Sequence, residues 1–273
     1  MIILGFLVMK ETYPPIILAR QKRKMQKRMG NVTLKTPYEQ DKTVGQLYRN
    51  SLVRPFQLLR MQPIVQVLAL FYAYLYGLMY LVLSTFAVLW ETKYNESISS
   101  ASLNYFALGV GYLFGSQICG LFADPIYRAL RSRNSGTGKP EFRVVLMFPA
   151  SLLVPIGLLW YGWGAQSGTH WIVPDLGIGL FACGTMISFQ CTTAYLYEAF
   201  TLYAASATGA VYVLRGMTGF GFPLFGSAMY KTLDYGWGNT VLALVAVVLG
   251  FPAPLIMWRY GEKLRSMSSY ARG

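Results

Sequence analysis

Long stretches without Asp, Glu, Lys or Arg recur along most of the chain. They cover residues 61–90, 97–123, 144–174, 176–197 and 235–258, and only Arg215 interrupts a sixth between Glu198 and Lys231. About 20 consecutive apolar residues cross a bilayer as a helix, because each residue adds ~1.5 Å across a ~30 Å hydrocarbon core. A membrane β-barrel would instead show alternating segments of ~10 residues, which this sequence lacks. The pattern predicts an all-α membrane protein with six transmembrane helices, near residues 64–89, 101–123, 143–163, 174–197, 206–229 and 239–258.

Shorter segments flank the predicted bundle. Residues 1–9 are apolar but too short to span, and they lack the basic start and the cleavage site of a signal peptide. Residues 20–42 are polar and carry no fold signal, whereas residues 43–60 are amphipathic and can lie in the membrane surface. The expected organisation is a remnant of a preceding transmembrane helix over 1–9, a basic cytoplasmic linker with a short amphipathic segment over 10–60, a six-helix bundle over 61–258 and a cytoplasmic tail over 259–273.

Composition supports this class and excludes others. Apolar residues make up 54% of the 273 residues and charged residues 13%, with a mean hydropathy of +0.39. A soluble domain is about a quarter charged, and a disordered chain has low hydrophobicity, so both are excluded. Three cysteines and one histidine indicate neither a disulfide framework nor a Cys/His metal site. Without a nucleophile–base constellation or a phosphate-binding glycine loop, we expect no catalytic residue, no metal, no cofactor and no enzyme activity.

The basic residues are distributed by topology. Of the 24 Lys and Arg residues, 21 lie in residues 10–60, in the connection after the second helix and in the C-terminal tail, and only Lys93 and Lys231 lie in the opposite connections. Because basic loops stay cytoplasmic, both ends are predicted to be cytoplasmic, which agrees with six crossings. This distribution also explains the net charge of +13, so we expect no nucleic-acid partner. The basic run over 20–28 is expected to touch anionic membrane lipid.

Two glycosylation sequons test this orientation. They begin at Asn31 and at Asn95. The predicted topology places Asn95 outside and Asn31 inside, so only Asn95 is expected to carry a glycan.

The end of the second predicted helix and the connection after it contain Gly120, Asp124 and Arg128 at fixed spacing, which we expect to form a gating loop motif. Asp124 stands at the cytoplasmic end of the helix, where it can accept hydrogen bonds from backbone donors of a neighbouring helix terminus. Arg128 follows one turn later and can pair with it. The alternative is a simple cytoplasmic loop with unrelated charges.

Gly120-x3-Asp124-x2-Tyr127-Arg128 resembles the loop signature G-x-x-x-D-x-x-G-R of the major facilitator superfamily, with Tyr127 in place of a glycine. A tyrosine at this position of the motif resembles the pattern of the fungal twelve-helix drug:proton antiporter-like branch. Further segments similar to this branch are residues 11–18, Arg54-Pro55-Phe56, Pro63-Ile64-Val65, Pro140-Glu141-Phe142-Arg143 and Phe222-Pro223-Leu224-Phe225. The superfamily has two six-helix bundles, and this chain resembles only the second, so the fifth-helix signature of antiport is outside it.

The resemblance implies a fold, a function and partners. The fold is the C-terminal six-helix bundle of a major facilitator transporter, a truncated form of the whole. The function is proton-coupled efflux of small hydrophobic molecules, such as drugs or fungal secondary metabolites, across the plasma membrane. The implied partners are membrane lipid, a small-molecule substrate, a proton gradient, and a missing N-terminal half or a second copy of the chain. The alternatives are a truncated, transport-inactive fragment and a half that works only as a dimer.

Arg215 is the one charged residue well inside a predicted span. A charge at the bilayer centre costs about 2.5–3.5 kcal/mol on insertion scales, so such residues face a cavity or a partner. Two interpretations are open: Arg215 faces a central substrate cavity, or it forms a structural ion pair with Glu198 at the cytoplasmic end of the preceding helix.

Tyr72, Tyr76 and Tyr80 recur every four residues and share one helix face. They can line a substrate cavity that stacks flat apolar molecules, or they can be ordinary helix packing. Asn104 and Gln190 are further cavity candidates, although hydrogen bonds between helices explain them equally well.

Overall fold

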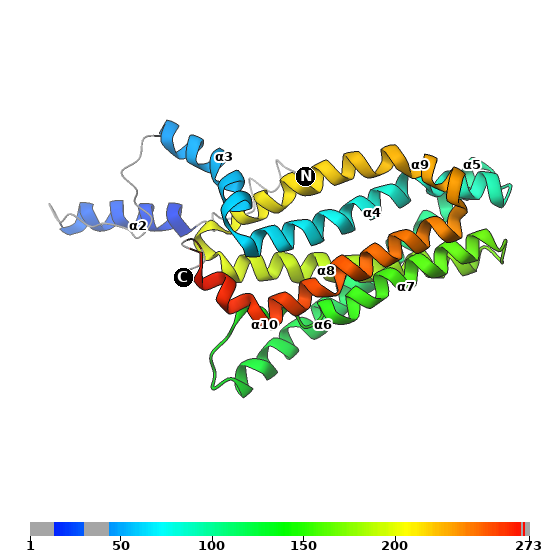
Figure 1. Ribbon diagram of the computed structural model, residues 1–273. Helices are drawn as coiled ribbons and strands as arrows, with labels where there is room; N and C mark the ends of the chain where they lie inside the picture. Colours follow the sequence, from blue (N-terminus) through cyan, green and yellow to red (C-terminus); the bar gives the residue numbers. More distant parts are fainter. Residues whose placement is uncertain (1–13, 30–43, 269, 271–273) are drawn as a thin grey trace. The chain divides into compact units, whose positions relative to one another are not determined.

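The computed structural model describes residues 14–29, 44–268 and 270, and within these ranges it contains helices and no strand. The chain forms two units, residues 1–50 and 51–273, which we describe separately (Figure 1). The expected helix remnant over 1–9 and the sequon at Asn31 lie outside the described residues.

The first unit contains helix α2, Pro14–Met29. The polar linker expected from residue 20 onward is therefore helical as far as Met29. The sequence explains this difference, because Ala, Arg, Lys, Gln and Met are good helix formers. Pro14 and Pro15 occupy the first turn, where a missing backbone donor costs little.

Helix α3, Val44–Met61, begins in the first unit and ends in the second. It covers the segment predicted to be amphipathic. In the second unit, its Leu58 is buried and its Phe56 is exposed. The Arg54 guanidinium lies 4.7 Å from the ring centroid of Tyr203, which fixes the end of α3 against the start of a later helix.

The second unit is a bundle of long helices. They are α4 (Pro63–Lys93), α5 (Ile98–Leu103), α6 (Tyr105–Arg133), η1 (Pro140–Val144), α7 (Met147–Gln166), α8 (Ile172–Ala199), η2 (Thr201–Tyr203), α9 (Ala204–Gly250) and α10 (Pro252–Ser266). Among the described residues, five helical segments are long and apolar enough to cross a membrane: 63–93, 98–133, 140–166, 172–199 and 201–266. The predicted all-α membrane architecture is confirmed.

The last of these segments makes two crossings. It has 66 residues, or about 99 Å of helix at about 1.5 Å per residue, roughly three times a bilayer core. The backbone leaves helical geometry at Asp234, where φ is 56° and ψ is 178°, and the chain reverses direction there (Figure 1). The first part of α9 and the second part with α10 are therefore the fifth and sixth predicted helices.

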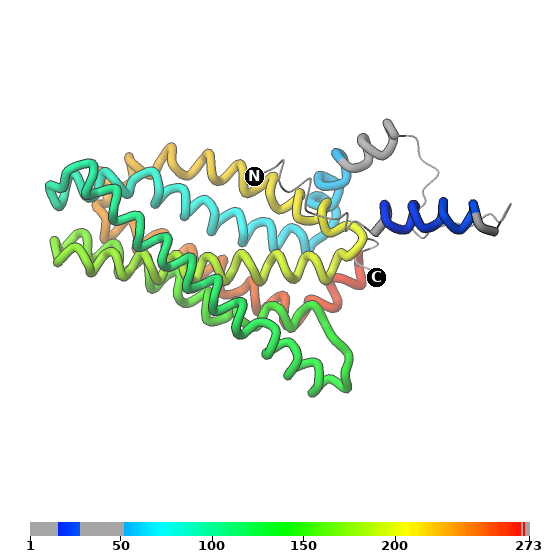
Figure 2. Tube along the Cα trace, turned by 180° about the vertical axis from the view of Figure 1, so that it is seen from behind, coloured from blue at the N-terminus to red at the C-terminus, as the bar shows by residue number. Residues whose placement is uncertain are grey.

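Helix α6 is longer than the sequence pattern predicted. It continues through Pro125 to Arg133, so Asp124 and Arg128 lie on a helix and not in a loop. The added turns contain Ala129, Leu130 and Arg131, which favour helix. Figure 2 shows these turns and the connection to α7 extending beyond the neighbouring helices.

Glycines set the contacts around α8. A Cβ on Gly177 of α8 would overlap the backbone of Tyr161 in α7, and a Cβ on Gly157 would overlap the backbone of Phe181 in α8. On the other side, a Cβ on Gly111 of α6 would overlap the carbonyl oxygen of Gly179. Small residues allow this close approach of helix backbones in a membrane.

This geometry predicts a sharp difference between two neighbouring glycines of α6. Gly111→Val should destabilise the bundle by about 1–3 kcal/mol or more, because overpacking forces backbones apart. Gly109→Val is the matched control, since a Cβ there meets nothing within 4 Å. Thermal unfolding of both variants in detergent measures the effect. Equal melting temperatures would contradict the α6–α8 contact.

Helix α4 is held between the two parts of α9. The Tyr74 hydroxyl donates to the carbonyl oxygen of Leu242 at 2.6 Å, and the Thr218 hydroxyl donates to that of Ala73 at 2.6 Å. These bonds orient α4 so that Tyr72, Phe71 and Leu75 are buried. The rotation of α4 decides which side chains reach the site described next.

A buried ion pair joins η1 to α10. The Glu141 carboxylate accepts hydrogen bonds from Nε and Nη2 of Arg265 at 2.9 and 3.0 Å. The Glu141 side chain is only 6% exposed and that of Arg265 19%. Lys139, the residue just before η1, forms a second pair with Glu262 of α10 at 2.7 Å, but Glu262 is 71% exposed.

Candidate functional site

Three tyrosines of α4 run from the interior to the surface of the bundle. Tyr72 is buried, Tyr76 is partly buried and Tyr80 is 38% exposed. The rings of Tyr76 and Tyr80 lie 4.7 Å apart, and the Tyr76 hydroxyl donates to the Tyr80 hydroxyl at 3.2 Å. The expected shared face is therefore present in the structure.

Two further helices contribute aromatic rings to this face. Phe189 of α8 stacks on Tyr72 with centroids 4.2 Å apart and an interplanar angle of 26°. Tyr212 of α9 lies 6.1 Å from Tyr72, and Phe189 also approaches Tyr76 at 6.3 Å. The rings thus come from three helices that are distant in sequence.

Arg215 of α9 completes this group. Its guanidinium carbon lies 4.5 Å from the ring centroid of Tyr76 and 4.0 Å from that of Tyr212. We call Tyr72, Tyr76, Tyr80, Phe189, Tyr212 and Arg215 the aromatic–arginine cluster. At about 1.5 Å per residue, Arg215 lies about 17 Å along α9 and Tyr76 about 20 Å along α4, so the cluster is near the middle of both spans.

The interpretation in which Arg215 pairs with Glu198 was wrong. Arg215 forms no ion pair with Glu198, which is bound to Arg143 instead. Among the described residues, no carboxylate lies within ion-pair distance of Arg215. Ring faces contribute about 0.5–2 kcal/mol each to a cation, which offsets part of the cost of a charge inside the membrane.

The cluster has a definite binding chemistry. Its aromatic faces can stack on a flat apolar molecule, and a planar guanidinium presents several donors to an oxygen acceptor. The Tyr76–Tyr80 hydroxyl pair provides a further polar contact.

A second group of charges lies where α6, η1 and α8 meet. Arg143 donates through Nε to Glu198 at 2.7 Å and through Nη1 to Asp124 at 2.6 Å. Its guanidinium also lies 4.4 Å from the ring centroid of Tyr127. We call Asp124, Tyr127, Arg143 and Glu198 the Arg143 network.

The structure also contradicts the expected pairing of Asp124 with Arg128, because Asp124 pairs with Arg143 instead. Arg128 is exposed and forms no ion pair within the described residues, and Gly120 is exposed as well. Asp124 and Arg128 share one face of α6, yet Asp124 accepts from Arg143 of η1 at 2.6 Å. A cavity of about 140 Å³ beside the network is lined in part by Gly120, Asp124 and Arg143.

The remaining polar candidates lie apart from the cluster. Gln190 donates to the Ser116 hydroxyl at 3.0 Å across the α6–α8 contact, and Asn104 donates to Glu96 at 3.0 Å at the opposite end of the bundle. The Gln190 contact matches the helix-to-helix alternative, whereas Asn104 bonds to the connection between α4 and α5. Asn95 is exposed in the connection after α4, with φ at 51°.

Sequence reasoning missed Arg143, Phe189 and Tyr212. Tyr212 carried a usable signal, since it stands three residues before Arg215 and so shares its helix face. Arg143 stood out only as part of the segment Pro140-Glu141-Phe142-Arg143, which carries the resemblance but indicates no pairing, and nothing in the neighbourhood of Phe189 separates it from other apolar residues. Within the described residues, no three His, Cys, Asp or Glu side chains form a group that could hold a metal ion.

The comparisons with known proteins identify the relatives of this chain. It is 43% identical over 266 residues to the MFS-type transporter oryF of Aspergillus oryzae, 40% over 271 residues to the efflux pump vrtL of Penicillium aethiopicum, and 41% over 265 residues to the efflux pump radE of Floropilus chiversii. These matches cover 97–99% of this chain but 49–55% of the relatives. No family model and no solved structure matches.

The chain spans about half the length of the curated relatives that it matches. Its apolar helices make it an integral, multi-pass membrane protein. Over nearly its whole length the chain is about 40% identical to proteins named MFS-type transporters and efflux pumps, which is consistent with a half-length MFS fragment.

Proposed function

We propose that this chain forms half of a secondary transporter that exports small hydrophobic molecules, such as drugs or fungal secondary metabolites. Relatives named as efflux pumps support export as the direction of transport. The aromatic–arginine cluster supports the substrate class, because its rings and guanidinium suit a flat apolar molecule with an acceptor group.

The observation that carries the proposal is the position of Arg215. An arginine in the middle of a span without a carboxylate partner is energetically costly, and here its contacts are the rings of Tyr76 and Tyr212 and the side chain of Tyr72. A purely structural arginine would gain more from an ion pair such as that of Arg143. Arg215 is therefore available to a ligand.

We propose a proton gradient as the driving force, since the sequence has no phosphate-binding glycine loop for ATP. In this proposal the Arg143 network acts as a gate. It joins α6, η1 and α8, so movement of α6 relative to α8 must break or stretch its contacts. Asp124 is mostly exposed whereas Arg143 is 21% exposed, which makes the Asp124 contact the weaker one.

The complete transporter would need a second bundle. In the superfamily architecture, substrate sites lie between two repeats near the midplane. Helix α6 is the least buried of the described spans, and its exposed side chains include Phe106, Leu113, Phe114 and Leu121. The second bundle is an N-terminal half supplied separately or a second copy of this chain; a transport-inactive fragment is the alternative.

Transport can be tested in yeast cells loaded with Nile red, a neutral fluorescent dye with a flat ring system and one carbonyl acceptor. The chain is expressed alone and together with the N-terminal half of the oryF transporter. We expect faster dye efflux than from empty-vector cells in at least one of these strains, and we expect a protonophore to abolish the difference.

The outcomes separate the alternatives. Efflux by the chain alone, with cross-linked dimers, supports self-assembly. Efflux only in the co-expressing strain supports a half-transporter. No efflux in either strain, despite membrane insertion of both halves, would favour the inactive fragment and contradict the proposed function.

We further propose plasma-membrane localisation with both ends in the cytoplasm. This orientation predicts a glycan on Asn95 in a secretory host, removable by endoglycosidase and abolished by Asn95→Gln. Asn31→Gln should leave the electrophoretic shift unchanged. If the shift instead depended on Asn31, the orientation would be inverted.

A further inference from the structure

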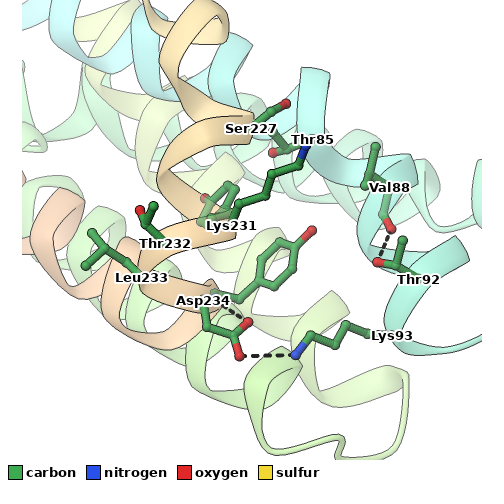
Figure 3. Close-up of a pocket in the computed structure, with 11 residues that line it drawn as sticks. Thr85, Val88, Thr92, Lys93, Ser227, Lys231, Thr232, Leu233 and Asp234 are labelled. Atoms are coloured by element: carbon green, nitrogen blue, oxygen red, sulfur yellow. Dashed lines mark hydrogen bonds and ion pairs between the residues drawn. The ribbon is translucent and has the colours of Figure 1, made fainter.

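A cavity of about 710 Å³ lies between the last turns of α4 and the part of α9 before its bend at Asp234. Figure 3 shows its lining residues. Thr85, Val88, Thr92 and Lys93 come from α4, and Ser227, Tyr230, Lys231, Thr232, Leu233, Asp234 and Tyr235 come from α9. The cavity is at the opposite end of the bundle from the Arg143 network, the end that the charge distribution predicts to be outside.

The two lysines of this cavity are unusual for their side of the membrane. Lys93 and Lys231 are the two basic residues, out of 24, that fall in the connections opposite the basic side. They are 138 positions apart in the sequence, yet both line the same cavity. Positive charge is normally sparse on this side, so its concentration around one cavity calls for a physical reason.

The lysines have different surroundings. Lys93 is bound to Asp234, with 3.1 Å between Nζ and Oδ2. Lys231 forms no hydrogen bond or ion pair within the part of the chain that the structure describes. Its side chain runs toward Thr85 and Ser227, whereas Lys93 points to Asp234 (Figure 3).

Most hydroxyl groups around Lys231 already donate hydrogen bonds within the protein, so few donors remain for a ligand. Thr85 donates to the carbonyl oxygen of Leu81, Thr92 to that of Val88, and Thr232 to those of its own helix. The Tyr230 hydroxyl donates to Asn239 at 3.1 Å. The donors left for a ligand are the ammonium of Lys231, the hydroxyls of Ser227 and Tyr235, and the remaining N–H groups of Lys93.

The charge balance of the cavity is positive. Asp234 is the one carboxylate among its lining residues, and it is already engaged by Lys93. The other acidic groups near this end, Glu91, Glu96 and Asp175, do not line the cavity. Val88, Leu233 and the rings of Tyr230 and Tyr235 supply apolar walls, so a charged group and a flat apolar body can be accommodated together.

We propose that this cavity binds an organic monoanion, a carboxylate or phenolate on a flat apolar body, with Lys231 as its principal contact. Ser227 donates a second hydrogen bond, and Asp234 limits affinity by neutralising Lys93. As a statement about substrate class, the proposal rests on the proposed transport function, because an exported molecule would occupy this site on its way out.

The experiment measures binding without transport. The full chain is placed in lipid nanodiscs, and radiolabelled 2-naphthoate is followed by equilibrium dialysis against empty nanodiscs. The neutral isostere 2-naphthamide is the matched ligand. We expect 2-naphthoate to bind about tenfold more tightly than 2-naphthamide, which corresponds to about 1.4 kcal/mol.

Two variants of opposite effect locate the anion. Lys231→Gln should remove most of the preference for 2-naphthoate, and Lys231→Arg should keep it. Asp234→Asn should strengthen 2-naphthoate binding about threefold or more, because it releases Lys93. Asn has the same shape as Asp, and its side-chain oxygen can still accept the hydrogen bond that the Tyr235 N–H donates to Asp234 at 2.8 Å, so the bend is retained. Lys263→Gln, in the last turn of α10, is the control and should change nothing.

Several results would overturn the proposal. Equal binding of 2-naphthoate and 2-naphthamide would do so, as would unchanged preference in Lys231→Gln with the variant correctly folded. Loss of binding in Arg215→Gln but not in Lys231→Gln would move the anion to the aromatic–arginine cluster. Anion binding without Nile red efflux in either strain would leave the site intact and contradict only the transport function.

Discussion

Replacing Arg215 by Gln is expected to reduce Nile red efflux by about 10-fold to 100-fold in whichever strain shows transport. The variant loses the guanidinium donor that would meet the acceptor group of the substrate. A hydrogen bond to a charged group contributes about 1.5–3 kcal/mol, which corresponds to about 10-fold to 100-fold in affinity. Initial efflux rates at several dye concentrations measure the effect.

Arg215→Lys separates charge from shape. Lysine keeps the positive charge but lacks the planar fork that stacks on Tyr76 and Tyr212, so an intermediate loss is expected. Arg133→Gln, an exposed position in the last turn of α6, is the control. A binding role also predicts that Arg215→Gln folds normally, because the variant removes an intramembrane charge that has no carboxylate partner.

The contrary outcome is equally clear. If Arg215→Gln exports the dye at the normal rate, the cluster is packing and not a binding surface. If the variant is inserted but melts far below the parent protein, Arg215 is structural, and the substrate site must lie elsewhere.

Replacing Glu141 by Ala is expected to lower the free energy of unfolding by about 2–4 kcal/mol. Removing one partner of a buried ion pair costs about 3–5 kcal/mol, since the other charge remains without its partner. We expect a smaller loss of unfolding free energy than this, because Arg265 is 19% exposed and can be reached by water. Glu141 is nearly inaccessible and makes two hydrogen bonds to Arg265, so the loss should still be large.

Glu262→Ala provides a matched control at the α10 end of the neighbouring pair. Glu262 pairs with Lys139 but is 71% exposed, and such surface pairs contribute about 0–1 kcal/mol. Thermal or denaturant unfolding in the same detergent compares the two variants. The double variant of Glu141 and Arg265 to Ala should recover part of the lost stability. If Glu141→Ala were no less stable than Glu262→Ala, the attachment of α10 to η1 would not depend on the buried pair.

The candidate site was only partly predictable from the sequence. The periodicity of Tyr72, Tyr76 and Tyr80 predicted a shared face, and the isolation of Arg215 in an apolar span marked it as unusual. Neither feature predicted that they would meet, because α4 and α9 are separated by three spans. The wrong pairing of Arg215 with Glu198 came from treating neighbouring charges in the sequence as neighbours in space.

The ion pairs of the Arg143 network were not predicted from the sequence, for a similar reason. Asp124 and Arg128 are one helical turn apart, and the sequence offered no sign that η1 would bring Arg143 closer to Asp124. Arg143 reaches both Asp124 and Glu198 because α6 and α8 approach each other at glycines such as Gly111 and Gly115. That approach depends on how each helix is rotated.

The sequence by itself determined the class of this protein, the approximate positions of its spans and the uneven distribution of its charges. These properties follow from hydrophobic and basic patterns along the chain, and a bilayer responds to such patterns directly. The tertiary structure alone decided which charges pair, which rings surround Arg215 and that Lys93 and Lys231 line the same cavity. Those outcomes depend on helix rotation and on the bend at Asp234, which arise from contacts between residues far apart in the chain.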